Sequence, residues 1–126
     1  MIYGIGIDIA KVSRFIKWYE NPNMLKRYFH DDEVSYIFSK AKVGAVQSIA
    51  ARFAAKEAFG KALGTGLMGI TLKDVSVYKK NTGQPELKLY GNIQKFVHES
   101  GICAVHLSLS HEKEYAIAQV LLEKTK

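Results

Sequence analysis

The sequence predicts an α+β fold in which a mainly antiparallel sheet is packed by one long helix and several short helices. Residues 2–9 alternate between apolar and small or polar side chains, as a strand does. Residues 44–63 carry apolar side chains at helical spacing. Two pairs of further strand-like segments are joined by the polar turns 81–85 and 111–114, which makes the paired strands antiparallel neighbours.

The chain has 126 residues, which predicts a single domain, 1–126, with a modest core. Its one cysteine, Cys103, allows no intramolecular disulfide and predicts a reducing compartment. Asp8 stands near the start without a basic leader, which argues against a signal peptide. No stretch free of charge exceeds about a dozen residues, too short to span a bilayer. We therefore expect a cytoplasmic protein with no membrane partner.

The chain is basic, and its partners are expected to be anionic. The net charge is +6, from 18 Lys and Arg against 12 Asp and Glu. Such a balance favours nucleic acid, an acidic protein or a phosphorylated ligand as partner. The charge is concentrated in residues 11–27, which hold five basic residues and one acidic residue, Glu20.

The first strand, 2–9, has two different faces. From position 4 onward, one face carries Ile5, Ile7 and Ile9, and the other carries Gly4, Gly6 and Asp8. Glycines beside a carboxylate are expected to leave space above it for a ligand.

Short helices follow this strand. Residues 11–19 are predicted to form a short basic helix with an apolar inner side, which residues 21–23, Asn-Pro-Asn, are expected to break. A second helix is predicted over 31–39, beginning at Asp31 or Asp32, because acidic residues suit a helix N-terminus.

The long helix, 44–63, contains an apparent misfit. Its apolar stripe comprises Val46, Ile49, Ala50 and Phe53. At about 100° per residue, Glu57 lies about 40° from Phe53 and so falls within that stripe. Gly64 is expected to end the helix in a left-handed conformation.

The remaining elements are predicted as strands 71–79 and 86–90, a short helix 91–99, and strands 103–110 and 115–122. Cys103 is expected in the core.

Asp8 and Glu57 are the candidate metal ligands. Two carboxylates from separate elements are a minimal set for Mg²⁺, which completes its shell with waters and substrate phosphates. Each also has a plain structural interpretation: Glu57 could pair with Lys61 one turn on, and Asp8 could face solvent on an edge strand. Spacing alone leaves these alternatives open.

Three segments together resemble one family: GIGIDI at 4–9, ARFAAKEAFGKALGTG at 51–66 and HLSLSHEKEYAIAQV at 106–120. The chain resembles the small phosphopantetheinyl transferases of the bacterial holo-acyl-carrier-protein synthase type. The resemblance implies a Mg²⁺-dependent enzyme that moves 4′-phosphopantetheine from coenzyme A to a serine of apo-acyl carrier protein. Adenosine 3′,5′-bisphosphate is the other product, and the reaction supports fatty acid biosynthesis.

The resemblance also implies roles for individual residues. Asp8 and Glu57 match the family's metal ligands, and Glu57, Lys61 and His111 are the expected catalytic residues. The residues expected to bind coenzyme A are Arg52, Lys61, Gly64, Thr65, Gly66, Pro85 and His111. Gln84 stands where relatives often carry a basic residue, and the base that deprotonates the serine stays open between Glu57, a metal-bound water and His111.

The expected protein partner is acyl carrier protein, which is acidic. Arg14 matches a family arginine that docks the carrier, and Lys17 lies one turn further along the same predicted helix. The resemblance implies a homotrimer with its clefts between subunits.

Three rival functions are weaker. An RNA-binding module would suit the charge, but no strand shows an aromatic pair for base stacking, so we expect no nucleic-acid partner. A sugar-kinase-like nucleotide binder needs two large domains. A carrier-binding scaffold without activity would not need Asp8, Glu57 and Lys61.

Overall fold

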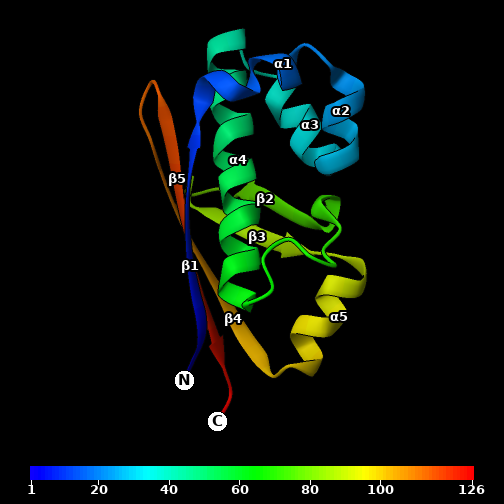
Figure 1. Ribbon diagram of the computed structural model, residues 1–126, viewed down its shortest axis with the longest axis vertical. Helices are drawn as coiled ribbons and strands as arrows, with labels where there is room; N and C mark the ends of the chain where they lie inside the picture. The colour runs from blue at the N-terminus through cyan, green and yellow to red at the C-terminus, as the bar shows by residue number, and fades with distance from the viewer.

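Helix α4 (Lys42–Leu63) runs through the centre of the molecule, with a sheet on one side and the other elements on the opposite side (Figure 1). The computed structural model describes residues 1–126. Most residues of α4 are buried, so the helix lacks the broad solvent-facing side of a surface helix. Gly64 ends it with φ of 88°, the left-handed cap that the sequence predicts.

Five strands form two antiparallel sheets, which confirms the predicted fold class. The larger sheet has the order β1 (Ile2–Lys11), β5 (Tyr115–Lys124), β4 (Ile102–His111). The smaller sheet pairs β2 (Val75–Lys79) with β3 (Pro85–Leu89). The predicted strand 71–79 is too long, because Leu72–Asp74 form a short 3₁₀ helix, η2.

The short helices differ most from the prediction. The helix expected over 11–19 is a 3₁₀ turn, η1 (Val12–Phe15), followed by α1 (Ile16–Tyr19). Helix α2 (Pro22–Tyr28) was not predicted. The Asn-Pro pair that ends α1 also begins α2, because the Asn21 side chain accepts a hydrogen bond from the Met24 N–H and proline suits the first helical position.

Helix α3 (Asp31–Phe38) begins at Asp31, as the sequence predicts, but neither Asp31 nor Asp32 is its cap. His30 is the N-cap residue: its Nδ1 accepts from the Asp32 N–H at 3.1 Å, and Glu33 Oε1 accepts from the His30 N–H at 3.0 Å. This reciprocal pair is a capping box with histidine in the usual place of serine. Helix α5 (Gly91–Glu99) lies at the opposite end of the molecule.

The glycine face of β1 packs directly on α4. A Cβ atom on Gly4 would overlap the carbonyl oxygen of Ala62, and one on Gly6 would overlap that of Ala58. The sequence-based interpretation that these glycines leave room for a ligand is therefore wrong. They leave room for the backbone of α4, and the alanines of the helix supply the other half of the close contact.

The opposite face of the larger sheet is exposed and apolar along β1. Ile5, Ile7 and Ile9 are each more than half exposed. Cys103 is also exposed, so its predicted place in the core is wrong. The pairing of β4 with β5 shifts register between Ile102 and Ala104, and Cys103 lies in that irregularity.

The core comprises one cluster of buried apolar side chains around α4. A membrane-spanning helix is not among the elements of this fold, since none combines the necessary length with the necessary apolar run.

We expect the substitution Gly6→Ala to destabilise the protein by about 2–3 kcal/mol, the usual cost of overpacking a close contact. Gly44→Ala is the matched control, because a Cβ there would meet only the Lys40 Cβ at 3.7 Å, an ordinary contact. Helix propensity should make that control more stable by about 0.5–1 kcal/mol. Urea unfolding measures the free energy of unfolding of both variants. Equal stability of the two would contradict the close packing of β1 on α4.

Candidate active site

Asp8 and Lys61 meet where β1 crosses the C-terminal half of α4. Lys61 Nζ donates to Asp8 Oδ1 at 3.2 Å and to the Ile7 carbonyl at 3.0 Å. Asp8 points from the glycine face of β1 toward the helix, and only 18% of its side chain is exposed. The carboxylate is therefore held at the margin of the core by a cation that remains half exposed.

Glu57 lies one helical turn before Lys61 and completes an acidic group with Asp8. Burial and then the Asp8 charge raise the pKa of the Glu57 carboxyl, while Lys61 and Arg14 act in the opposite direction. A carboxylate whose ionisation is opposed by burial and by a neighbouring carboxylate suits a bound cation. No cluster of three or more His, Cys, Asp or Glu residues occurs, and two carboxylates are the usual protein contribution to Mg²⁺.

Arg14 and Lys17 lie exposed on η1 and α1. The Arg14 guanidinium stands 5.1 Å from the centroids of both the Phe15 and Phe53 rings. These contacts hold a cation at the surface next to the acidic group.

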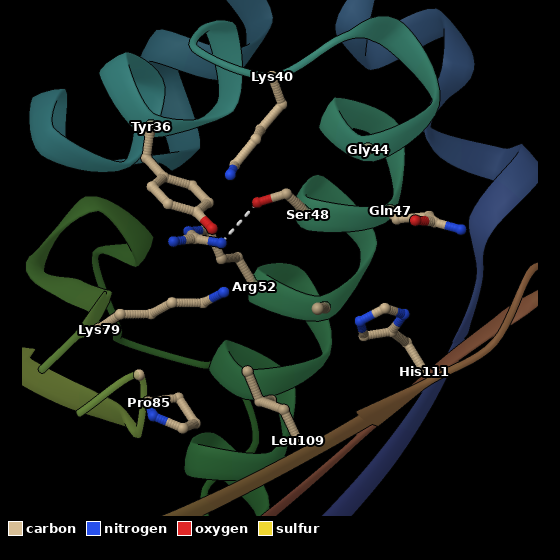
Figure 2. Close-up of a pocket in the computed structure, with 12 residues that line it drawn as sticks. Tyr36, Lys40, Gly44, Gln47, Ser48, Arg52, Lys79, Pro85, Leu109 and His111 are labelled. Atoms are coloured by element: carbon tan, nitrogen blue, oxygen red, sulfur yellow. Dashed lines mark hydrogen bonds between the residues drawn. The ribbon is translucent and has the colours of Figure 1, made fainter. Parts of the chain in front are cut away.

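A basic pocket of about 410 Å³ lies on another side of α4 (Figure 2). We use "basic pocket" for the space between α3, α4, the β2–β3 hairpin and the end of β4. Its charged or titratable lining residues are Tyr36, Lys40, Arg52, Lys79 and His111. No carboxylate lines it, so the pocket is suited to an anion that carries several charges.

Arg52 projects from α4 into this pocket. Its Nη1 donates to Ser48 Oγ at 2.5 Å, and its guanidinium lies 4.3 Å from the Tyr36 ring centroid. Its Nε is buried and has no hydrogen-bond partner. A hydrogen bond with Lys79, together with the charges of Lys79, Lys40 and Arg52, lowers the pKa of the Tyr36 phenol, although burial opposes them. The lowered pKa of the Tyr36 phenol therefore indicates that the pocket is strongly positive.

The residues expected to bind coenzyme A occupy three places. Arg52, Pro85 and His111 line the basic pocket, whereas Lys61 contacts Asp8. Residues 64–66 form the turn after α4, about 18 Å along the helix axis from Arg52. In that turn the Gly64 and Gly66 N–H groups already donate to carbonyls of α4, so the turn does not present a row of free N–H groups.

Sequence reasoning missed Tyr36, Lys40 and Lys79. They come from α3, the segment after it, and β2. The only sequence signal of Lys40 and Lys79 is positive charge next to the start of α4 and next to the hairpin turn, and such charges are usually solvated. Tyr36 has no signal of its own.

The acidic group and the basic pocket lie at opposite edges of the larger sheet. β1 carries Asp8 at one edge, and β4 carries His111 at the other. On α4, Glu57 and Arg52 are about 140° apart around the helix. One copy of the chain therefore presents two separate places suited to charged ligands, which we call half-sites in view of the function proposed below.

Comparisons with known proteins give the family. Residues 4–120 match the model of the 4′-phosphopantetheinyl transferase superfamily. The chain belongs to this superfamily. The resemblance expected from its sequence motifs is confirmed, and the chain is a member of a family of transferase enzymes.

Individual superfamily members are similar over their full length. A holo-(acyl-carrier-protein) synthase of Treponema denticola is 52% identical over 123 residues, covering 98% of this chain and 99% of that protein. The structure of the Neisseria meningitidis synthase has a TM-score of 0.90 at 35% identity and covers 98% of this chain and 100% of its own. The Bacillus anthracis synthase, in complex with coenzyme A (3′,5′-ADP), has a TM-score of 0.84 at 35% identity, with 99% of each chain covered.

We expect Glu57→Gln to raise the melting temperature in EDTA at neutral pH. The raised pKa of Glu57 means that the folded state holds this proton more tightly than the unfolded chain, so ionisation costs stability. The difference in melting temperature between the variant and the parent should shrink as the pH falls toward 4.5, the ordinary pKa of a glutamate carboxyl. At that pH the Glu57 carboxyl of the parent is increasingly protonated and, like glutamine, carries no charge.

Mg²⁺ titration completes this test. Added Mg²⁺ should raise the melting temperature of the parent but not that of Glu57→Gln, since only the parent keeps both carboxylates. Equal stabilisation of the two proteins by Mg²⁺ would exclude Glu57 as a ligand.

Proposed function

We propose that this protein transfers 4′-phosphopantetheine from coenzyme A to a serine of apo-acyl carrier protein and releases adenosine 3′,5′-bisphosphate. The observation that carries the proposal is the pair of half-sites: an acidic group suited to a metal ion and a basic pocket suited to nucleotide phosphates. Membership of the superfamily supplies the reaction type, and the coenzyme A complex of the Bacillus anthracis relative supports the ligand.

Asp8 and Glu57 are the residues that would hold Mg²⁺. Their closeness and the raised pKa of Glu57 support this fit. When bound, the ion would supply charge neutralisation for the diphosphate and polarise the phosphorus under attack. Lys61, whose ammonium already lies 3.2 Å from Asp8, would neutralise the negative charge that develops on the leaving phosphate.

The basic pocket would bind the phosphates of the nucleotide portion of coenzyme A. Arg52 offers a guanidinium fork that lies over the Tyr36 ring, and Lys40 and Lys79 add ammonium groups. His111 would donate a further hydrogen bond to a phosphate at the end of β4. Pro85 and Gly83 form the wall at the hairpin turn.

Two copies of the chain would be needed to complete one cleft. The half-sites lie at opposite sheet edges, so placing the β1 edge of one copy beside the β4 edge of the next brings them together. A head-to-tail interface closes into a ring when the rotation between copies allows it, and we propose a closed trimer, as the family resemblance implies. The exposed isoleucines of β1 support an assembly that covers them.

The carrier protein would dock on η1 and α1. Arg14 and Lys17 are exposed there, and Arg14 lies close enough to Glu57 for its charge to lower that carboxyl's pKa. A carrier bound to these cations would place its serine beside the acidic group. We propose that the reaction takes place in the cytoplasm, where a carrier for fatty acid biosynthesis would be found.

Intact mass of apo-acyl carrier protein tests the function. Incubation with this protein, coenzyme A and Mg²⁺ should add one phosphopantetheine group, and EDTA should prevent the addition. Asp8→Ala should fold but give no product, since one of the two proposed ligands is lost. No mass gain with any of several apo carriers would contradict the proposal and favour a carrier-binding scaffold.

Arg14→Glu should raise KM for the carrier on the order of tenfold while leaving KM for coenzyme A unchanged, because reversed charge opposes an acidic partner. Lys95→Glu is the matched control, since Lys95 is exposed on α5, far from η1. The effect of Arg14→Glu should shrink as salt rises. Equal KM values for the carrier in the two variants would refute docking through Arg14.

A further inference from the structure

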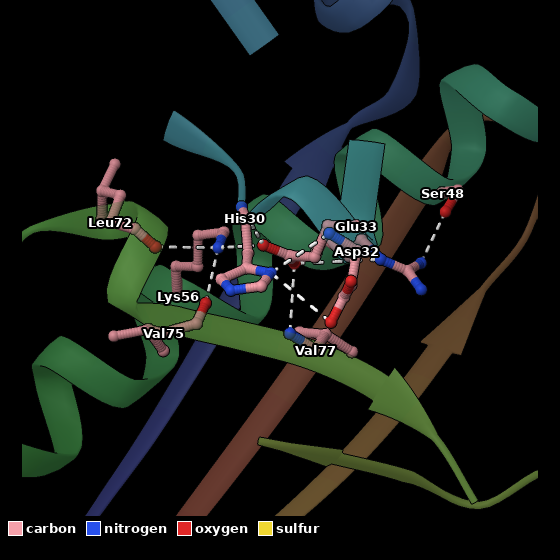
Figure 3. Close-up of polar contacts among 9 residues, drawn as sticks. His30, Asp32, Glu33, Ser48, Lys56, Leu72, Val75 and Val77 are labelled. Carbon is pink, nitrogen blue, oxygen red and sulfur yellow. Dashed lines mark hydrogen bonds and ion pairs between the residues drawn. The ribbon is translucent and has the colours of Figure 1, made fainter. Parts of the chain in front are cut away.

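Glu33 lies at the centre of a buried polar network behind the basic pocket (Figure 3). Its side chain is 1% exposed, and Lys56 beside it is fully buried. Glu33 Oε1 accepts hydrogen bonds from Lys56 Nζ at 2.7 Å and from the His30 N–H at 3.0 Å. A buried carboxylate with this many donors is held in one orientation.

The second oxygen of Glu33 reaches two further elements. Oε2 accepts from the Val77 N–H of β2 at 3.1 Å and lies 3.8 Å from Arg52 Nε on α4. Lys56 adds bonds of its own, donating to the Leu72 carbonyl at 2.9 Å and the Val75 carbonyl at 2.5 Å. One ion pair thus ties together α3, α4 and the start of the hairpin.

These same elements carry three side chains of the basic pocket, Arg52, Tyr36 and Lys79. Arg52 precedes Lys56 by one turn of α4, and Tyr36 follows Glu33 by one turn of α3. Lys79 follows Val77 by two residues on β2, so both point to the same side of that strand. A shift of the network would therefore move three walls of the pocket at once.

Arg52 depends on Glu33 more directly. Its Nε is buried without a hydrogen-bond partner, and the carboxylate of Glu33 is the only anion that pairs with it. Burial lowers the pKa of both Arg52 and Lys56, and the Glu33 charge is the main influence opposing this in each. The Glu33 carboxylate thus pairs with two buried cations, Arg52 and Lys56, so one positive charge stays uncompensated beside the pocket.

We propose that Glu33 is a positioning residue for the anion-binding pocket: it fixes Arg52, and the elements that carry Tyr36 and Lys79, in the arrangement that receives the ligand's phosphates. This inference rests on the proposed function, in which the pocket binds the nucleotide portion of coenzyme A. Glu33 itself contacts no ligand in this account.

Two other roles make opposite predictions. If Glu33 only weakened the positive field of Arg52, removing its charge would tighten anion binding. If Glu33 only stabilised the fold, any replacement that restored stability would restore binding. A variant that keeps both the net charge and the buried volume separates the three roles.

The double variant Glu33→Gln/Lys56→Met meets this need. It removes one negative and one positive charge together, so neither Glu33 nor Lys56 is left as a lone buried charge. Glutamine has one acceptor oxygen, so it cannot accept from the His30 and Val77 N–H groups on its two sides as the carboxylate does. The lost bonds to buried backbone groups should lower the melting temperature, so binding is measured by calorimetry well below it. There we expect the folded variant to bind adenosine 3′,5′-bisphosphate roughly tenfold more weakly than the parent does.

Two controls make the result specific. Glu86→Gln removes a carboxylate that pairs with Lys80 on the same hairpin but lies outside the pocket, and it should leave the dissociation constant unchanged. In an Arg52→Gln background, the double change should weaken binding much less than in the parent, because the group that Glu33 positions is already absent. In transfer assays the double variant should raise KM for coenzyme A more than it lowers kcat.

Each contrary result overturns the inference. Unchanged or tighter binding by a folded double variant would show that Glu33 does not position Arg52, and so would a full additional loss in the Arg52→Gln background. If the parent itself failed to bind adenosine 3′,5′-bisphosphate, the proposed function of the pocket would fail, and this inference with it.

Discussion

The backbone of β1 approaches that of α4 at Gly4 and Gly6, and the rest of the architecture depends on that contact. Because neither glycine has a side chain, the strand lies flush against the helix and carries Asp8 to within hydrogen-bonding distance of Lys61. The same contact turns the isoleucine side of the strand outward. A larger side chain at either glycine would move the strand away from the helix and separate the two halves of the acidic group.

Because α4 is covered by other elements on several sides, it can contribute a residue to each of the two half-sites. With the sheet on one side of the helix, and α3 and the hairpin on the other (Figure 1), Glu57 lies near Asp8 of β1, whereas Arg52 points into the basic pocket (Figure 2). Burying a basic residue such as Lys56 in such a helix is costly, and Glu33 offsets that cost with a carboxylate from α3. The ion pair therefore links the packing of the fold to the shape of the basic pocket.

Alternation, turn residues and helical spacing predicted the strands, the long helix and the fold class, since these signals are local. The same signals misjudged α2, because Asn21-Pro22 both ends one helix and begins the next. The buried pair of Glu33 and Lys56 joins residues 23 positions apart and has no local signature. The basic pocket likewise draws on separate elements. Motifs indicated Asp8 and Glu57, but no spacing rule shows which faces meet.

The measurement that tests the central claim most directly is complementation between two inactive variants, one in each half-site. Asp8→Ala lacks the acidic half and Arg52→Gln the basic half, so each homogeneous protein should be nearly inactive. After co-expression, the mixed assembly should recover activity in about a quarter of its clefts, where the intact halves of two copies meet. Activity no higher than that of the separate variants would contradict a site shared between copies.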